Sequence, residues 1–268
     1  MAFRAYQALS RSQRLTRAVL KVRNVCDALI GARLNEGIEP ERNGEAWLVR
    51  AVAPRAQAAI DVGANIGVWT RLFLAHAPGV SRVLLLEPSD LAYRELERVF
   101  DGDARVTCLN TAVSDTAGTG RFFEEPSAGE TSSLLQAHSR RDARSTEVDV
   151  TTLDALLEQH SMPRVDFVKI DAEGYDGRVL RGGESALAEH RLGIVQFEYN
   201  RPWALAGETL AGALSLLHSH GYRVFLLRSS GLHEFEYERY GEFLSYANFV
   251  AVAPESLDVL APHVREPR

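Results

Sequence analysis

Four acidic residues follow short apolar segments of the chain, at the places where the buried strands of an α/β protein would end. They are Asp61, Glu87, Asp171 and Glu198. Ligands of open α/β sheets bind outside the carboxyl ends of the strands, so these acids are the first candidates for a site. Asp171, Glu198 and Glu173 are alternative general bases, and two or three of them together would suit one Mg²⁺ ion.

A glycine turn follows Asp61. Gly63 lets the backbone turn tightly and lets a ligand come close. The helix that we expect to begin near Gly67 offers unpaired N–H groups. The dinucleotide fingerprint GxGxxG would require glycine where Asn65 stands, and the carboxylate of Asp61 would repel a pyrophosphate. The turn therefore favours a cationic ligand over a dinucleotide such as NAD.

Glu87 ends the next apolar segment and is followed directly by Pro88. A carboxylate at this place in a nucleotide-binding fold can accept hydrogen bonds from both hydroxyls of a ribose. The alternative interpretation is a simple exit from the strand. Because the glycine turn lies upstream, ribose binding is the favoured interpretation.

The elements that must position these residues alternate between short apolar runs and helical patterns. The expected strands are 58–62, 82–87, 105–110, 165–171, 193–199, 222–227 and 247–253. The expected helices are 67–77, 90–100, 152–160, 175–181, 185–191 and 208–220. This alternation predicts a doubly wound, mostly parallel sheet of the α/β class.

The stretch 118–150 breaks the alternation because it is largely polar, with a strand expected only at 146–150. Long insertions in compact domains are usually functional or disordered, and here we expect a loop that covers a substrate. His138, inside this stretch, is the histidine to test as a base, although a solvated loop histidine is the simpler interpretation. Trp203 follows the fifth expected strand and is a candidate lining residue of the substrate pocket.

The N-terminal segment has the pattern of a basic amphipathic helix over 3–33. Its first 33 residues hold seven Lys or Arg and one acid, a net charge of +6. Apolar side chains fall on one stripe at helical spacing: Leu15, Val19, Val22, Cys26 and Leu29. Packing on the body or on a second subunit is the favoured interpretation, and contact with an anionic membrane surface is the alternative. Residues 1–42 are thus expected to form a helical extension and linker before one domain over 43–268.

Composition excludes several classes of protein. The 268 residues are 46% hydrophobic and 25% charged, as in soluble globular proteins, and no apolar run approaches the ~18 residues of a membrane span. The net charge is −6, so the chain after residue 33 carries −12, which argues against a nucleic-acid partner. Cys26 and Cys108 form no CxxC pair, which argues against a zinc cage or disulfide framework and fits a cytoplasmic location.

Four segments together resemble the FkbM family of S-adenosylmethionine-dependent methyltransferases. They are 60–67, 87–88, 112–115 and 165–174, the last of which (VDFVKIDAEG) is the most specific. The resemblance covers about residues 43–253. It implies the class I methyltransferase fold, a Rossmann-like sheet of seven strands in the order 3-2-1-4-5-7-6 with strand 7 antiparallel.

The resemblance also assigns roles to residues. It places the methionine end of the cofactor at the glycine turn, the ribose at Glu87 and the adenine near 110–112. With Asp61 included, the expected cofactor-binding residues are Asp61, Gly63, Ala64, Asn65, Gly67, Glu87, Pro88, Asn110, Thr111 and Ala112. Ser132 and Ser133 resemble a family loop near the methyl acceptor.

In that strand order, the four strands that end in acids are neighbours. Carboxylates spaced by ~4.8 Å would line one sheet edge over roughly 14 Å. S-adenosylmethionine brings a sulfonium, an ammonium and a ribose diol to meet such a row. Lys169 shares the strand parity of Asp171, so we expect it to pair with an acid of the row.

The expected function is O-methylation of a hydroxyl on a sugar, a glycan or a secondary metabolite. The alternatives are N-methylation of a small molecule and a non-catalytic membrane-associated or scaffold protein that retains the nucleotide-binding fold. The sequence leaves the acceptor, the metal dependence and the oligomeric state open.

Overall fold

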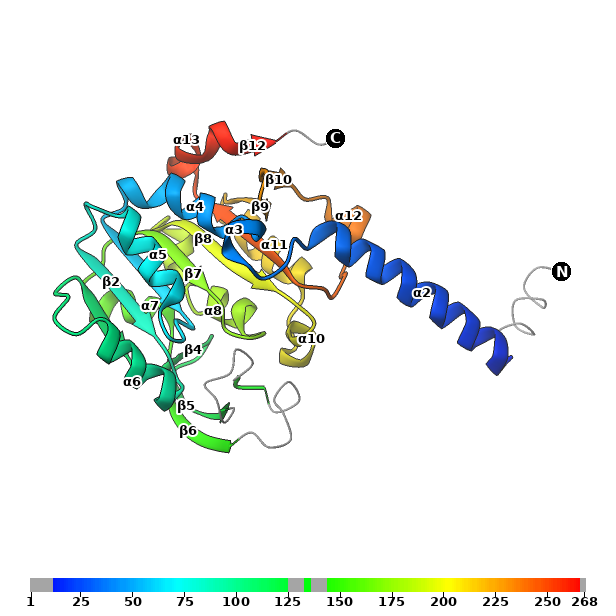
Figure 1. The fold of residues 1–268 in the computed structure, drawn as a ribbon, viewed down its shortest axis with the longest axis horizontal. Coiled ribbons are helices and arrows are strands. Elements are labelled where there is room, and N and C mark those ends of the chain that lie inside the picture. Colours follow the sequence, from blue (N-terminus) through cyan, green and yellow to red (C-terminus); the bar gives the residue numbers. More distant parts are fainter. Residues whose placement is uncertain (1–11, 125–132, 136–143, 266–268) are drawn as a thin grey trace.

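The computed structural model describes residues 12–124, 133–135 and 144–265. Its centre is a nine-stranded sheet with helices on both faces (Figure 1). The strand order is β3-β2-β1-β7-β8-β11-β9-β10-β12. The strands are β1 (Ala58–Val62), β2 (Arg82–Leu86), β3 (Val106–Leu109), β7 (Val165–Ile170), β8 (Leu192–Tyr199), β9 (Arg223–Arg228), β10 (Gly231–Glu234), β11 (Ala247–Val252) and β12 (Val264–Arg265).

The strands that end near the four acids are consecutive and parallel. β1 pairs with β2 and with β7, and β7 pairs with β8, all in parallel register. β11 runs antiparallel to β8 and to β9. The expected sheet of seven strands is corrected to nine, because the chain turns back after β9 to form β10, which β12 joins at the edge.

Helices pack on both faces of this sheet, whereas α2 (Gln13–Leu34) projects from the body. The other helices of the described residues are α3 (Pro40–Asn43), α4 (Glu45–Val52), α5 (Val68–His76), α6 (Asp90–Val99), α7 (Leu153–Gln159), α8 (Asp176–Arg181), α9 (Glu184–Ala188), α10 (Pro202–Ala206), α11 (Leu210–Ser219), α12 (Tyr237–Tyr240) and α13 (Leu257–Leu260). Side chains alternate along each strand, so β1 sends Ala59 into one apolar cluster and Ile60 into the other. Both faces of the sheet are therefore buried, and this packing holds the strand ends that form the site in fixed positions.

The expected irregular loop over 118–150 is wrong at its N-terminal end, where a strand begins at Gly118, while the strand expected at 146–150 is confirmed as part of β6 (Arg144–Thr151). β5 (Gly118–Glu124) pairs antiparallel with β6, and β4 (Ala112–Val113) joins β6 to complete a second sheet of three strands. Phe122 and Phe123 are buried in it. The insertion is therefore a strand pair beside the cavity described below, with residues 125–132 and 136–143 outside the described part.

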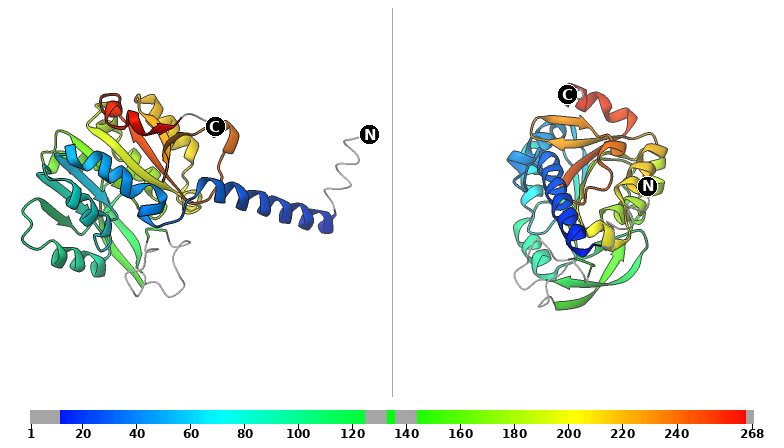
Figure 2. Two further views of the ribbon diagram at one scale, coloured as in Figure 1. Left: turned by 45° about the horizontal axis from the view of Figure 1, so that its top comes forward. Right: turned by 90° about the vertical axis from the view of Figure 1, so that its right-hand side faces the viewer.

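The helix α2 leaves the body and projects away from it (Figures 1 and 2). Of its residues, Gly31 and Leu34 are the buried ones, and both lie in its last turn. Of the two forms of the favoured expectation, packing on the body is wrong for the part that the structure describes, and packing on a second subunit stays a prediction. In that part, no helix combines the length and the apolar character needed to cross a membrane.

Candidate functional site

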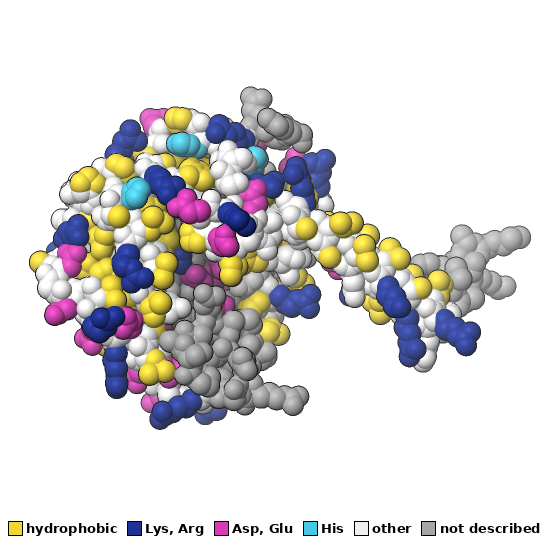
Figure 3. All heavy atoms as spheres, viewed as in Figure 1, with side chains coloured by type: hydrophobic (Ala, Val, Ile, Leu, Met, Phe, Trp, Pro, Cys, Tyr) yellow, Lys and Arg dark blue, Asp and Glu magenta, His cyan; other side chains and the backbone are white. Residues whose placement is uncertain are grey.

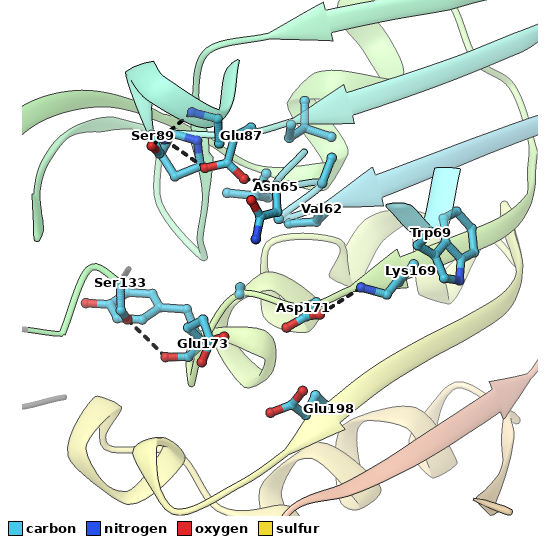
Figure 4. A pocket seen from close by; sticks show the side chains of 18 of the residues that line it. Val62, Asn65, Trp69, Glu87, Ser89, Ser133, Lys169, Asp171, Glu173 and Glu198 are labelled. Atoms are coloured by element: carbon cyan, nitrogen blue, oxygen red, sulfur yellow. Dashed lines mark hydrogen bonds and ion pairs between the residues drawn. The ribbon is translucent and has the colours of Figure 1, made fainter. Parts of the chain in front are cut away.

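A cavity of about 530 Å³ lies at the carboxyl ends of β2, β1, β7 and β8 (Figure 4). This volume is within the usual range of small-molecule sites. The expected site residues that line it are Gly63, Ala64, Asn65, Glu87, Pro88, Thr111, Ala112, Ser133, Asp171, Glu173 and Glu198. The structure therefore brings most of the sequence candidates to one place.

Glu87 is buried at one end of the cavity. Its carboxylate accepts a hydrogen bond from the backbone N–H of Asn65 and another from that of Ser89, both at 2.8 Å. Burial raises the pKa of Glu87 to about 7, although the two N–H groups favour the charged form. The carboxylate is thus fixed in position, and its charged form would be stabilised by any ligand that donates hydrogen bonds or brings positive charge.

Gly63 shapes the turn between Glu87 and Asp171. Its φ is +76°, and a Cβ at this position would lie 1.9 Å from the carbonyl oxygen of Asp171. The N–H groups of Gly63 and Ala64 both donate to the carbonyl of Leu86, at 2.9 and 3.1 Å. Glycine is therefore required here, because the tip of β1 passes directly against the loop that follows β7.

Lys169 and Asp171 form an ion pair at the floor of the cavity. Lys169 Nζ lies 2.8 Å from Asp171 Oδ2, and the side chains are 8% and 34% exposed. Burial lowers the pKa of Lys169, but the charges of Asp171, Asp61 and Glu45 outweigh it and the pKa is raised. The expected pairing of Lys169 with an acid of the row is confirmed.

Glu198 faces the cavity from β8, the neighbour of β7 (Figure 4). Asn200 Nδ2 donates to Glu198 Oε1 at 2.5 Å. Burial, followed by the charges of Asp171, Asp176 and Glu173, raises the pKa of Glu198 well above its ordinary value. A carboxylate in this environment accepts a proton more readily than one in water.

Ser133 reaches the site from the insertion. Its backbone pairs with that of Phe123, and its hydroxyl donates to the backbone carbonyl of Glu173 at 3.0 Å. Glu173 has a positive φ of 49°, and both residues line the cavity. Ser133 of the insertion therefore lines the cavity, and its place near a methyl acceptor stays a prediction.

Two expected cofactor residues lie behind the cavity wall. Asp61 is fully buried and accepts a hydrogen bond from Thr70 Oγ1 at 2.5 Å, because strand alternation turns it into the core. Burial raises its pKa to about 6. Gly67 caps α5, with Phe100 against the place where its Cβ would be. Neither residue is among those that line the cavity.

Other expected residues have different places. Asn110 donates to the backbone carbonyls of Glu87 and Pro88 and lines a separate cavity of about 170 Å³. Trp203 is fully buried, and its indole N–H donates to the carbonyl of Glu198, so its expected place in the substrate pocket is wrong. Ser132 and His138 lie outside the described residues.

Glu45 and Tyr246 line the cavity and were not expected there. Glu45 Oε1 accepts from Gln196 Nε2 at 2.5 Å, and Glu45 Oε2 accepts from Asn43 Nδ2 at 3.1 Å. Ile38 and Pro40, which the sequence placed in the linker, line the cavity as well. In the sequence, the one feature that could have pointed to Glu45 is its place directly after a glycine. In the structure this residue, Gly44, has a φ of +101°.

Acidic residues dominate the charge of the cavity. Its described lining contains one basic side chain, Lys169, and five acidic ones: Glu45, Glu87, Asp171, Glu173 and Glu198. A cationic ligand is attracted to such a lining and a pyrophosphate is repelled. Within the described ranges, no three His, Cys, Asp or Glu residues are grouped so that they could hold a metal ion, so the structure lends no support to a shared Mg²⁺.

Comparison with known proteins places the chain among methyltransferases. The family model described as Methyltransferase FkbM domain matches residues 61–224. In an alignment of 210 residues, the chain is 27% identical to the AMB antimetabolite synthetase AmbE of Pseudomonas aeruginosa, covering 65% of this chain and 10% of that protein. In an alignment of 142 residues, it is 25% identical to Methyltransferase 1 of Beauveria bassiana, covering 46% of this chain and 57% of that protein. The chain thus spans a tenth of the length of AmbE and little over half of the length of Methyltransferase 1.

Solved methyltransferases are more distant in sequence. The methyltransferase FkbM from Methylobacillus flagellatus superposes with a TM-score of 0.46 at 17% identity, covering 73% of this chain and 43% of that one. An O-methyltransferase from Bacillus cereus, solved with SAH, gives a TM-score of 0.42 at 13% identity, covering 92% and 94% of the two chains.

Proposed function

Since this chain belongs to the family of methyltransferase FkbM domains, we propose that it transfers a methyl group from S-adenosylmethionine to a hydroxyl group. The acceptor class that we propose is a sugar, a glycan or a secondary metabolite. The observation that carries the choice of donor is the charge of the cavity, in which five acids face one lysine.

The residues present fit such a donor. S-adenosylmethionine, when bound, supplies a methyl carbon on a positively charged sulfur, which is already a good leaving group. Glu87, fixed by two backbone N–H groups, would hold the ribose hydroxyls. The turn at Gly63, where a side chain would collide with Asp171, would leave the backbone open to the methionine end.

Glu198 is the residue that we propose as the base for the acceptor hydroxyl. It lines the cavity, and burial and three neighbouring acids raise its pKa. Asp171 is the alternative, but its carboxylate already pairs with Lys169 at 2.8 Å. In this scheme Glu198 would take the hydroxyl proton as the acceptor oxygen bonds to the methyl carbon and the bond from that carbon to sulfur breaks, so that the sulfur leaves as a neutral thioether. The chain holds both reactants in line, which can supply ~7–11 kcal/mol.

A labelled-methyl assay tests the class of acceptor. The full chain is incubated with methyl-labelled S-adenosylmethionine and matched pairs of alcohols and amines, such as a methyl glycoside and the corresponding amino sugar. The proposal predicts label in ether products of the alcohols. Label only in the amines would replace O-methylation by N-methylation, and no donor binding in calorimetry would remove the methyltransferase assignment itself.

A further inference from the structure

The projecting helix α2 carries an exposed apolar surface that the body does not cover. The side chains that form it are Leu15, Val19, Val22, Val25 and Leu29, which are 36–67% exposed. We call these five residues the apolar row. Their spacing of three, four and seven residues puts them on one side of the helix. Exposed rows of this kind usually mark an interaction surface.

Basic side chains border the apolar row. Arg14 and Lys21 lie on one border, since Lys21 is four residues before Val25, and Arg23 lies on the other, four residues after Val19. The helix holds five basic residues and one acid, Asp27, which is 3.7 Å from Arg23. Figure 3 shows the apolar side chains along α2 with basic side chains beside them toward its N-terminal end.

The exposed apolar surface continues at the mouth of the cavity. Ile38, four residues after the end of α2, lines the cavity and is 65% exposed. Ile66 and Val68 also line the cavity and are 38% and 54% exposed. Exposed apolar side chains therefore lie at the mouth of the cavity as well as on α2.

We propose that α2 docks the protein on an anionic membrane surface. The apolar row would enter the boundary between headgroups and acyl chains, and the bordering Arg and Lys side chains would extend to the phosphates. The positive charge of α2 favours an anionic membrane over a second copy of the chain as the partner of the apolar row. Two copies of α2 bring five basic residues against five others, whereas anionic lipids supply the opposite charge.

Vesicle flotation of the full chain tests the proposal, with vesicles of phosphatidylcholine alone and with a quarter of phosphatidylglycerol. We expect binding to the anionic vesicles that weakens as salt rises. The combined variant Val19→Glu, Val22→Glu, Val25→Glu is expected to lose binding. Arg14→Gln, Arg17→Gln, Lys21→Gln together should lower partitioning about a hundredfold. All six side chains are exposed, so the fold should persist, which circular dichroism checks.

The matched control is Leu205→Glu, an exposed apolar residue on α10 that is expected to leave binding unchanged. The proposal would be overturned if the wild-type chain did not bind anionic vesicles, or if either α2 variant bound them as well as the wild type does. A dimer in light scattering that the Val19, Val22, Val25 variant dissociates, without lipid binding, would assign the apolar row to a second copy instead. None of these readouts depends on methyl transfer, so the proposal and the proposed function can fail separately.

Discussion

Lys169 Nζ lies 2.8 Å from Asp171 Oδ2 and links the buried core to the floor of the cavity. Lys169 is almost fully enclosed, while a third of the Asp171 side chain is open. The neighbouring strand places Asp61 opposite Lys169 in register. The charge of Lys169 therefore balances two carboxylates, that of Asp61 inside the core and that of Asp171 at the floor of the cavity.

Removing this lysine should cost stability. Lys169→Met leaves Asp61 and Asp171 without their cation, and breaking a buried pair costs about 3–5 kcal/mol. Urea unfolding measures the loss. The control is Arg98→Met, which breaks the exposed pair with Glu95 and should cost far less, because solvent screens both of its charges. Equal losses in the two variants would mean that Lys169 does not balance buried charge.

Glu87 should make the unliganded protein less stable as pH rises. Its folded pKa of about 7 exceeds the ordinary 4.5, so the folded state binds more protons than the unfolded state between these values. Stability is therefore lost from pH 4.5 to 7, by about 3 kcal/mol. Urea unfolding of wild type and Glu87→Gln at pH 5 and 7.5 measures this loss, which should be smaller in the variant by the contribution of Glu87, while Asp61 and Glu198 still contribute in both proteins. Glu147→Gln, at an exposed site on β6, is the control, and identical pH profiles for wild type and Glu87→Gln would refute the assignment.

The turn at Gly63 should not tolerate a side chain. Gly63→Ala places a Cβ 1.9 Å from a backbone oxygen, whereas Gly102→Ala, at nearly the same φ of +77°, meets nothing within 4 Å. Both variants carry the ~1–2 kcal/mol cost of a left-handed residue, and only Gly63→Ala must also move the loop after β7. Thermal unfolding should show a clearly larger loss for Gly63→Ala, and similar losses would argue against this close approach.

Glu198 should matter for turnover more than for donor binding. Glu198→Gln removes the proposed base and should lower kcat about 10²–10⁴-fold, with the Kd for S-adenosylmethionine changed by only a few fold. Asp171→Asn is the companion variant, because Asp171 is the alternative base. If Glu198→Gln keeps its kcat while Asp171→Asn loses it, the two roles are exchanged.

The sequence could predict the part of the site that local chemistry controls. Gly63 and Asn65 are in place because a strand end and a tight turn are encoded within a few residues of one another, and Glu87 is in place because it directly follows the next apolar strand. Asp61 and Trp203 were assigned to the cavity wrongly, since each is turned inward by alternation or packing that only the folded sheet sets.

The missing part of the site comes from distant contacts. Asn43, beside Glu45, meets Tyr246 across 203 positions of sequence. No local pattern predicts such a contact. The strands β10 and β12 were not among the expected strands for a similar reason, because such short strands carry little periodicity and depend on the neighbour that they join.

The acidic cavity should select a cationic methyl donor. Titration calorimetry of the full chain with S-adenosylmethionine, and separately with NAD, measures this selection. We expect micromolar binding of S-adenosylmethionine, a weakening of about 1–3 kcal/mol in Glu87→Ala, and no measurable heat with NAD. Tight binding of NAD together with no heat from S-adenosylmethionine would contradict it.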